Sequence, residues 1–211
     1  ASEIFAQLSA GSLSGPFQLA GSLSVRDRRI ALDMSAGRRT ASGTFPVNAT
    51  LGFDGVAGEV RFGGLVSPDP FRVQGDLRAE GPDLAELLAG LWPEWSAPDP
   101  ARRPFRLTAA LVAERDSVAL NSLALTLGEF RASGAISAML GDARRIDLTL
   151  SANRLDLDRM LGGDGRLALP AMPEDFGLPG DLTATIDIGV DALTWRGGLI
   201  RDARVEGVLS D

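Results

Sequence analysis

The chain has no cysteine, no histidine, no lysine and no tyrosine among its 211 residues. Without cysteine it cannot form disulfides, use a thiol nucleophile or hold a metal through thiolates. Without histidine it lacks the usual general base and the commonest ligand of zinc and haem. Carboxylates are therefore the catalytic groups that remain, and the missing cysteines fit the cytosol and the periplasm equally well.

Aromatic residues and clustered positive charge are also scarce. Only 6% of the residues are aromatic, so buried surface must come from aliphatic side chains, which suit alkyl contacts better than stacking on bases or sugars. All 21 basic residues are arginines, scattered among 28 acids, and the net charge is −7. We expect no nucleic-acid partner, because binding a phosphate backbone requires a concentrated positive surface.

Long apolar runs are missing as well. No stretch approaches the roughly 18 to 20 apolar residues that a membrane-spanning helix needs. The N-terminus, Ala1-Ser2-Glu3, has no signal-peptide pattern and no methionine. We therefore interpret the chain as an internal segment of a longer protein.

What the chain does have is alternation of apolar and polar residues, the period of a strand with one buried face. The pattern predicts an all-β fold: a repeated antiparallel meander that forms an extended curled sheet or groove, with short connecting helices. The expected strands lie at residues 17–25, 30–35, 45–53, 59–62, 71–77, 105–113, 118–127, 130–138, 146–150 and 182–190.

The alternating pattern recurs in three similar units, each with an Ala-Leu pair that opens a second strand and a later glycine in a third. The pairs begin at Ala31, Ala119 and Ala192, and the glycines are Gly43, Gly134 and Gly207. Such self-similarity predicts one continuous sheet built from copies of a unit. The predicted divisions are a first unit at 1–91, a Pro/Trp-rich linker at 92–104, a second unit at 105–162, a Pro/Gly-rich connector at 163–180 and a truncated third unit at 181–211.

Local signals refine these units. The apolar parity changes between Leu120 and Leu123, which predicts a β-bulge near Asn121-Ser122. Asp54-Gly55 predicts a tight turn, and Pro46 must lie at a strand start, a bulge or an edge. Leucines at helical spacing predict a short helix over 83–91 with Asp83 as its N-cap, and a counterpart at 155–162.

A long sheet with one apolar face must cover that face with a second sheet, its own curled surface, a partner chain or lipid. The charged residues of the strands, such as Arg106, Asp147 and Asp187, lie on the opposite parity from the apolar side chains. An uncharged aliphatic face suits alkyl chains as well as it suits a closed core. Both interpretations stay open on parity alone.

The units and the segment 153–161, Asn-Arg-Leu-Asp-Leu-Asp-Arg-Met-Leu, resemble the AsmA family of bacterial envelope proteins, which includes the TamB-type proteins. The resemblance implies a parent protein anchored by an N-terminal helix in the inner membrane of a Gram-negative bacterium. It further implies a periplasmic β-sheet that curls into a groove with an apolar interior. Like the chorein-type bridge proteins, the family is thought to move phospholipid towards the outer membrane.

The leading hypothesis is thus a non-enzymatic groove that binds phospholipid acyl chains, with no cofactor and no metal. The residues expected to line it are Leu107, Leu111, Leu120, Leu148, Leu150, Ile186 and Ile188. The alternative is a structural or assembly module for outer-membrane proteins that presents exposed sheet edges to envelope partners.

Other functions have weaker support in the sequence. Carboxylate pairs such as Asp181/Asp187 or Asp156/Asp158 are candidates for acid–base work on a glycan, but solvated strand ends and helix caps explain these acids better. Calcium at 163–165, Gly-Asp-Gly, would lack enough oxygen ligands. Trp92 and Trp95 fit a membrane interface or, more simply, packing of the linker against the sheet.

Overall fold

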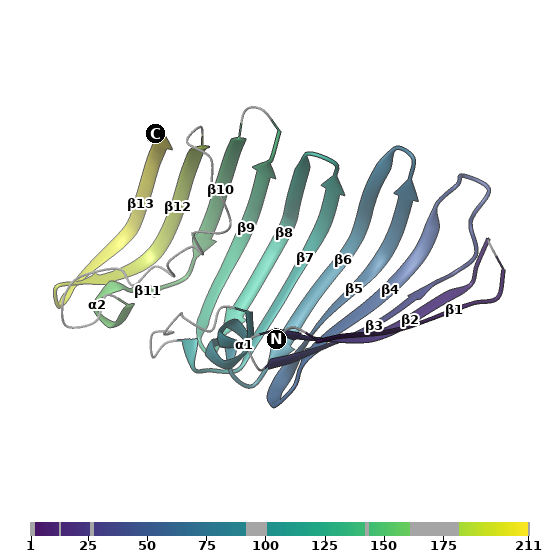
Figure 1. Ribbon diagram of the computed structural model, residues 1–211. Helices are drawn as coiled ribbons and strands as arrows, with labels where there is room; N and C mark the ends of the chain where they lie inside the picture. The colour runs from purple at the N-terminus through teal and green to yellow at the C-terminus, as the bar shows by residue number, and fades with distance from the viewer. Residues whose placement is uncertain are drawn as a thin grey trace.

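A computed structural model of the chain describes residues 3–12, 14–25, 28–91, 101–141, 144–160 and 182–210. These residues form one 13-stranded sheet with two short helices, shown in Figure 1, so the predicted all-β class is confirmed. The strands are β1 (Glu3–Ala10), β2 (Phe17–Val25), β3 (Arg28–Ala36), β4 (Phe45–Phe53), β5 (Val56–Pro68), β6 (Phe71–Gly81), β7 (Phe105–Glu114), β8 (Ser117–Leu127), β9 (Phe130–Met139), β10 (Arg144–Ala152), β11 (Leu155–Asp156), β12 (Leu182–Trp195) and β13 (Gly198–Ser210). The helices are α1 (Leu84–Leu91) and α2 (Leu157–Met160).

The sheet is an antiparallel meander from β1 to β10 and changes character after that. β12 lies beside β10 in parallel, β11 pairs in parallel with the far part of β12, and β13 returns antiparallel to β12. The expectation of a meander throughout is therefore wrong at this junction. Parallel neighbours require a long crossover, and here the chain passes through β11 and α2 before β12 begins again beside the start of β10.

Strand pairing places most apolar residues of the twelve long strands on the same face, which we call the apolar face. Residues of this face are directly paired with residues of the next strand, so the paired residues form rows that run across the strands. Two of these rows define the face. The α1 row consists of Ala6, Gly21, Leu32, Leu51, Val60, Ala79, Leu107, Leu125, Ala132, Ala152, Val190 and Ala203. The Leu120 row consists of Ala10, Phe17, Ala36, Val47, Gly64, Gly75, Leu111, Leu120, Ile136, Leu148, Ile186 and Gly207.

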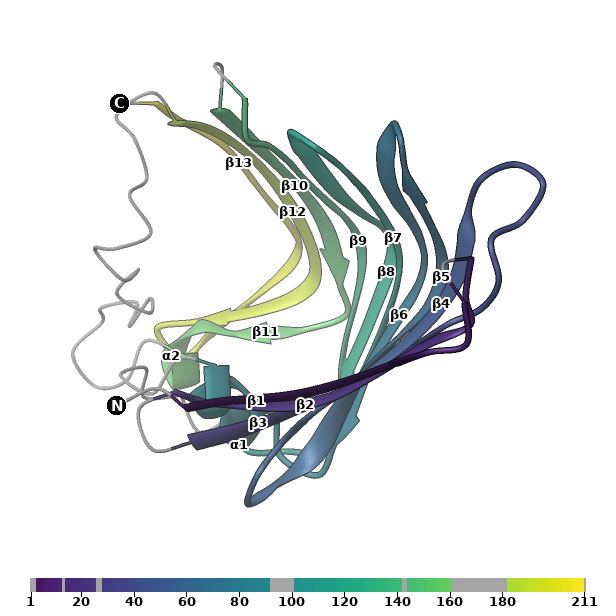
Figure 2. The same cartoon turned by 45° about the vertical axis from the view of Figure 1, so that its right-hand side comes forward.

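The sheet is curled and not closed, and the apolar face is its concave side. Figure 2 shows α1 and α2 on the concave side, and Leu87 of α1 packs against Phe53, Ala79 and Phe105 of the apolar face. The chain exposes 13988 Å², whereas a compact monomer of 22.1 kDa would expose about 9,300 Å². Among the described residues no large side chain is less than 2% exposed. The described part of the chain is therefore an open curled layer.

A pair of glycines lies at a close approach of the β5 and β6 backbones. Gly64 and Gly75 are directly paired in the Leu120 row. A Cβ on Gly75 would clash with the carbonyl oxygen of Gly63, and one on Gly64 would clash with that of Gln74. Only residues without a side chain allow this approach, which is a common device where a sheet bends.

Most local signals of the sequence are confirmed, but the helix expected over 155–162 is wrong at its start, where Leu155–Asp156 pair with β12 as β11 and α2 covers Leu157–Met160. The pairing of β8 shifts between Leu120 and Leu123, and Ser122 has a φ of 51°, so the predicted bulge is present. Pro46 lies at the start of β4, and Asp54-Gly55 forms the turn into β5. Asp83 caps α1, because its Oδ1 accepts a hydrogen bond of 3.1 Å from the backbone N–H of Glu86.

The repeat equivalence holds only loosely. Gly43 lies in the loop before β4, whereas Gly134 and Gly207 lie inside strands. Ala192 and Leu193 do not open a new strand, because β12 runs without interruption through them. Val190 and Leu193 nevertheless join the same buried cluster, so the alternation changes between them. The chain repeats hairpins of similar length, but the Ala-Leu pairs and the glycines do not occupy equivalent positions in the three units.

The strand boundaries also differ from the expected ones at several places. β1 was not predicted, and β5 continues six residues beyond the expected end at Phe62. β10 begins at Arg144, two residues before the expected start at Ile146. β6 pairs with β7 from Arg72↔Glu114 to Gly81↔Phe105, so the first two predicted units share one sheet. Trp92, Trp95 and the connector at 163–180 lie outside the described residues.

Substituting Leu87 tests whether α1 is fastened to the concave side. Leu87 is 4% exposed, so Leu87→Ala should lower the free energy of unfolding by about 2–4 kcal/mol through lost burial and a new cavity. Leu65→Ala is the matched control, because Leu65 lies on the opposite face and is 36% exposed. Its effect should stay at about 1 kcal/mol or less. Chemical denaturation measures both, and similar losses would contradict the packing of α1.

The glycine pair generates a second prediction. Gly75→Ala should lower the free energy of unfolding by about 1–3 kcal/mol, because the new methyl group meets backbone atoms that cannot move aside. Gly52→Ala, in the neighbouring β4, is the control, since a Cβ there meets nothing within 4 Å. Denaturation curves that leave both variants as stable as the parent would show that the close approach of β5 and β6 is not required.

Candidate functional site

The apolar face contains every residue that the sequence predicts as lining. Leu111, Leu120, Leu148 and Ile186 belong to the Leu120 row, in which Ile136 of β9 lies between Leu120 and Leu148. Leu150 and Ile188 are paired with each other, two residues beyond Leu148 and Ile186 in the direction of the helices. Leu107 lies in the α1 row. All seven are half-buried. The strand register therefore brings the predicted residues onto one surface.

The two helices divide this surface into a covered and an uncovered part. Around α1, a buried cluster joins Leu87 to Phe53, Ala79 and Phe105, and Leu107 packs against it. Around β11 and α2, a second cluster joins Ala152, Val190 and Leu193, and Ile188 packs against that one. No member of the Leu120 row belongs to either cluster. Leu107 and Ile188 thus serve partly as ordinary core, while the Leu120 row lies farther from the helices.

The face opposite the apolar one is polar and is covered with ion pairs. Some pairs join neighbouring strands, as in Arg72–Glu114 at 2.9 Å and Arg106–Glu80 at 3.2 Å, and others, such as Arg145–Asp147, lie within one strand. Arg204 donates two hydrogen bonds of 3.0 Å to Asp187. These bonds and the charges of Asp187 and Glu206 raise the pKa of Arg204 above its ordinary value.

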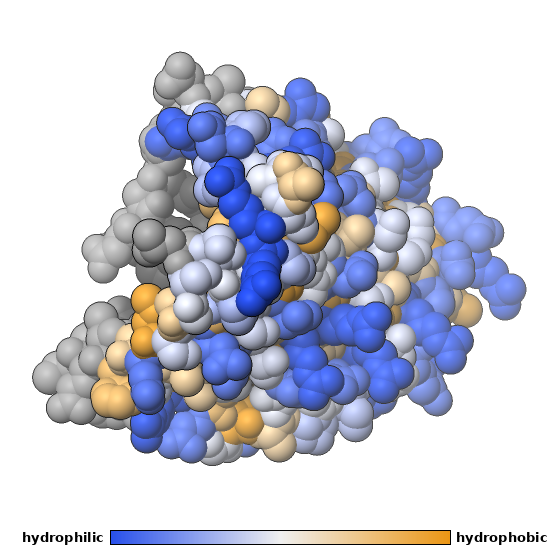
Figure 3. Space-filling view, turned by 90° about the vertical axis from the view of Figure 1, so that its right-hand side faces the viewer, coloured by the Kyte–Doolittle hydropathy of each residue, from blue (hydrophilic) through white to orange (hydrophobic). Residues whose placement is uncertain are grey.

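Seen from the right-hand side of Figure 1, the surface is mainly hydrophilic, with scattered apolar spots (Figure 3). A hollow of about 700 Å³ lies on this polar face over β5 to β7. Its walls carry both signs of charge: Glu59, Arg61, Asp76, Arg78, Glu80 and Arg106. Because both signs of charge line the hollow, it favours water over the selective binding of one kind of ion.

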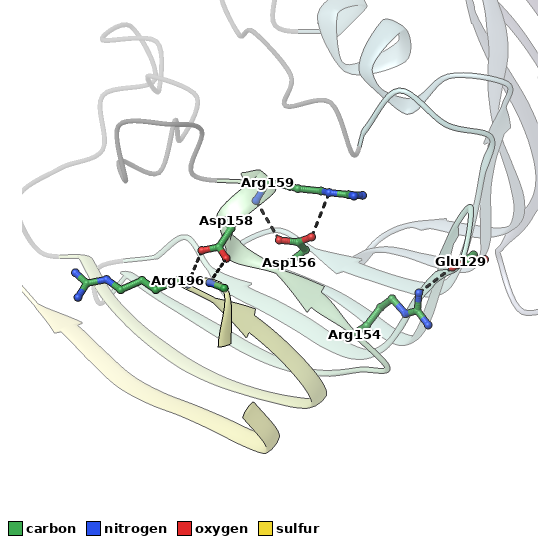
Figure 4. Close-up of polar contacts among 7 residues, drawn as sticks. Glu129, Arg154, Asp156, Asp158, Arg159 and Arg196 are labelled. Carbon is green, nitrogen blue, oxygen red and sulfur yellow. Dashed lines mark hydrogen bonds and ion pairs between the residues drawn. The ribbon is translucent and has the colours of Figure 1, made fainter. Parts of the chain in front are cut away.

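The segment that carries the family resemblance, residues 153–161, fastens turns together as far as it is described, to Met160 (Figure 4). Asn153 exchanges hydrogen bonds with the β8–β9 turn, donating to the carbonyl oxygen of Glu129 at 2.9 Å and accepting from the N–H of Arg131 at 2.9 Å. Arg154 pairs with the Glu129 carboxylate at 2.8 Å. The start of this segment therefore ties the end of β10 to a turn that precedes it by more than twenty residues.

The two aspartates of the same segment hold backbone amides. Asp156 caps α2 through a hydrogen bond of 3.1 Å from the N–H of Arg159. Asp158 accepts two hydrogen bonds from the β12–β13 turn, 2.6 Å from the N–H of Arg196 and 2.8 Å from that of Gly197 (Figure 4). Because both carboxylates have structural partners, neither is arranged as half of a catalytic pair.

The remaining acid–base candidate pairs Asp187 with a residue outside the described ones, Asp181. Asp187 itself is committed to Arg204 on the polar face. Within the described ranges no three acidic side chains gather as a metal site would require. The Gly-Asp-Gly sequence at 163–165 lies outside those ranges.

The predicted lining set misses two residues of interest. Ile136 was not named, although it stands between Leu120 and Leu148 in the Leu120 row and has the same aliphatic character. Arg144 precedes the strand expected at 146–150, but it is the first residue of β10 and shares the parity of Ile146 and Leu148. The alternation of 130–138 already places Ile136 with the apolar residues. That Arg144 lies on this face follows only from the start of β10 as the structure has it.

Comparison of the chain with protein-family models, with curated proteins and with solved structures finds no match. Neither described helix is long and apolar enough to cross a membrane.

The role of Asp158 is testable at the amides that it holds. Asp158→Ala should accelerate hydrogen exchange at Arg196 and Gly197 about tenfold and lower the free energy of unfolding by about 1–2 kcal/mol, because two charge-assisted hydrogen bonds are lost. Asp33→Ala, an exposed aspartate in the middle of β3, is the control and should leave both measurements unchanged. Unaltered exchange at the two amides in the Asp158 variant would contradict the fastening role.

Proposed function

We propose that this chain is a non-enzymatic periplasmic segment of an AsmA-like protein whose apolar face binds phospholipid and conducts it between the inner and outer membranes. The observation that carries the proposal is the Leu120 row: twelve uncharged residues in direct register across the sheet, on the concave side of a layer that does not close. The family resemblance of the sequence supplies the envelope location and the membrane anchor of the parent protein.

The dimensions of the row suit an acyl chain. Neighbouring strands are about 4.8 Å apart, so the stretch from Leu111 on β7 to Ile186 on β12 is about 19 Å long. Half of the hydrocarbon core of a bilayer, about 15 Å, is the length that one acyl chain occupies. The stretch is thus long enough to accompany a whole chain, and the remaining strands continue it in both directions.

The energetics favour an uninterrupted apolar path. Each methylene removed from water contributes about 0.8 kcal/mol, so an acyl chain left in water costs on the order of 10 kcal/mol. A row of uniform aliphatic character lets a chain move from one position to the next without leaving apolar surroundings. A charge within the row would instead have to be desolvated as the chain passed, at a cost of several kcal/mol.

A second candidate is supported by the sheet edges. Among the described strands β13 pairs only with β12 and β1 only with β2. β13 is 13 residues long and exposes Leu199, Val205 and Val208 at 60%, 54% and 67%. Long apolar edges accept further strands, which supports an assembly module for outer-membrane proteins as the alternative.

Charge substitution on the apolar face tests the leading proposal. Leu120→Asp should reduce phospholipid binding more than tenfold, since the carboxylate interrupts the row. Leu65→Asp is the matched control on the opposite face and should bind as the parent does. Phospholipid that copurifies in mild non-ionic detergent, quantified by native mass spectrometry, is the measurement, and Leu148→Asp repeats the test on another strand of the row.

Folding of the charged variants is checked by circular dichroism and thermal melting. On an open face the new carboxylate stays in water when no lipid is present, so both variants should fold. A lipid-free parent protein together with unfolding of Leu120→Asp would indicate a sealed core and refute the proposal. Variants that lose lipid but still support outer-membrane assembly in cells would favour the edge-mediated alternative.

A further inference from the structure

Arg144 is a charged residue that lies on the apolar face. From β4 to β10 it is the only charged residue whose strand parity puts it there, in line with Ile146, Leu148 and Leu150. It is the first residue of β10 and pairs with Leu182. α1 and α2 lie at the other end of the strands (Figure 1), so Arg144 stands at the end of the apolar face that the helices do not reach.

Arg144 is half-buried, and one nitrogen of its guanidinium lacks a partner within the described part of the chain. Its Nη1 is buried and has no hydrogen-bond partner among the described residues. The next residue, Arg145, points to the polar face, is 54% exposed and donates from Nε to both oxygens of Asp147 at 2.8 Å. A buried donor on a charged group costs free energy until an acceptor reaches it.

The surroundings define what that acceptor must be. A guanidinium presents a planar fork of N–H donors that matches the oxygens of a phosphate. The adjoining residues along β10 and across the Leu120 row are aliphatic, so a ligand that reaches Arg144 from the apolar face carries an alkyl part as well. A phosphate joined to alkyl chains is the chemistry of a glycerophospholipid.

We propose that Arg144 binds the phosphate of a phospholipid whose acyl chains lie on the apolar face, an inference that rests on the proposed lipid-binding function. The headgroup then sits at the β9–β10 end of the sheet, and the acyl chains extend from there over the Leu120 row. Arg144 sets both the orientation of the lipid and a preference for lipids that carry a phosphate over those that do not.

The test compares two fluorescent lipids that differ only in the headgroup, phosphatidylglycerol and diacylglycerol labelled on the same acyl chain, offered in non-ionic micelles. The parent protein should bind phosphatidylglycerol about tenfold more tightly than diacylglycerol. Arg144→Gln should abolish this preference while its affinity for diacylglycerol stays within about twofold. Arg145→Gln removes the same charge from the neighbouring position on the polar face and should behave as the parent does.

The outcomes separate the two proposals. If the folded parent binds neither lipid, the lipid-binding function itself is refuted. If it binds both lipids equally, or if Arg144→Gln and Arg145→Gln reduce the preference to the same extent, the headgroup site is refuted and lipid binding stands. Millimolar inorganic phosphate should not displace phosphatidylglycerol. Displacement by phosphate alone would identify a free-anion site and overturn the proposal.

Discussion

In-register pairing of alternating strands is the constraint on which the rest of the structure depends. Side chains in a strand point alternately to the two faces, so a slip of one residue would move a strand's apolar side chains to the polar face. Direct pairs such as Leu77↔Ala109 and Leu150↔Ile188 keep the aliphatic residues together across the sheet. The bulge at Ser122 serves the same end, because the extra residue returns the leucines of the second half of β8 to the apolar face.

The apolar face is covered differently at the two ends of the strands. At one end, α1 and the β11–α2 segment bury it in two small clusters. At the other end no described helix packs on it, and the chain exposes far more surface than a compact protein of its mass. The segment 153–160 holds the first of these ends together with hydrogen bonds to two separate turns. The result is a concave layer that the two helices cover at one end and that no described helix covers at the other.

The apolar face has the composition of a protein core, but the described part of the chain forms no second sheet to cover it. Aliphatic rows of this kind suit alkyl chains as well as they suit a closed core, because contacts with alkyl chains and contacts within a core are both non-directional and both depend on apolar area removed from water. The exception to uniformity is Arg144, and its place at the end away from the helices gives the face a polar boundary. An amphiphile has the same division into an apolar part and a charged end.

The alternation of the sequence by itself determined most of the strands, the bulge at Asn121-Ser122, the cap at Asp83 and the common face of all seven predicted lining residues, since each depends on local period or on neighbours within a few positions. Tertiary structure alone decided that β12 lies parallel to β10, that α1 covers Leu107 and leaves the Leu120 row free, and that Gly64 meets Gly75. It also decided that Arg144 belongs to a strand. These features depend on which distant segments pair, and a period of two specifies the face of a residue without specifying its partner.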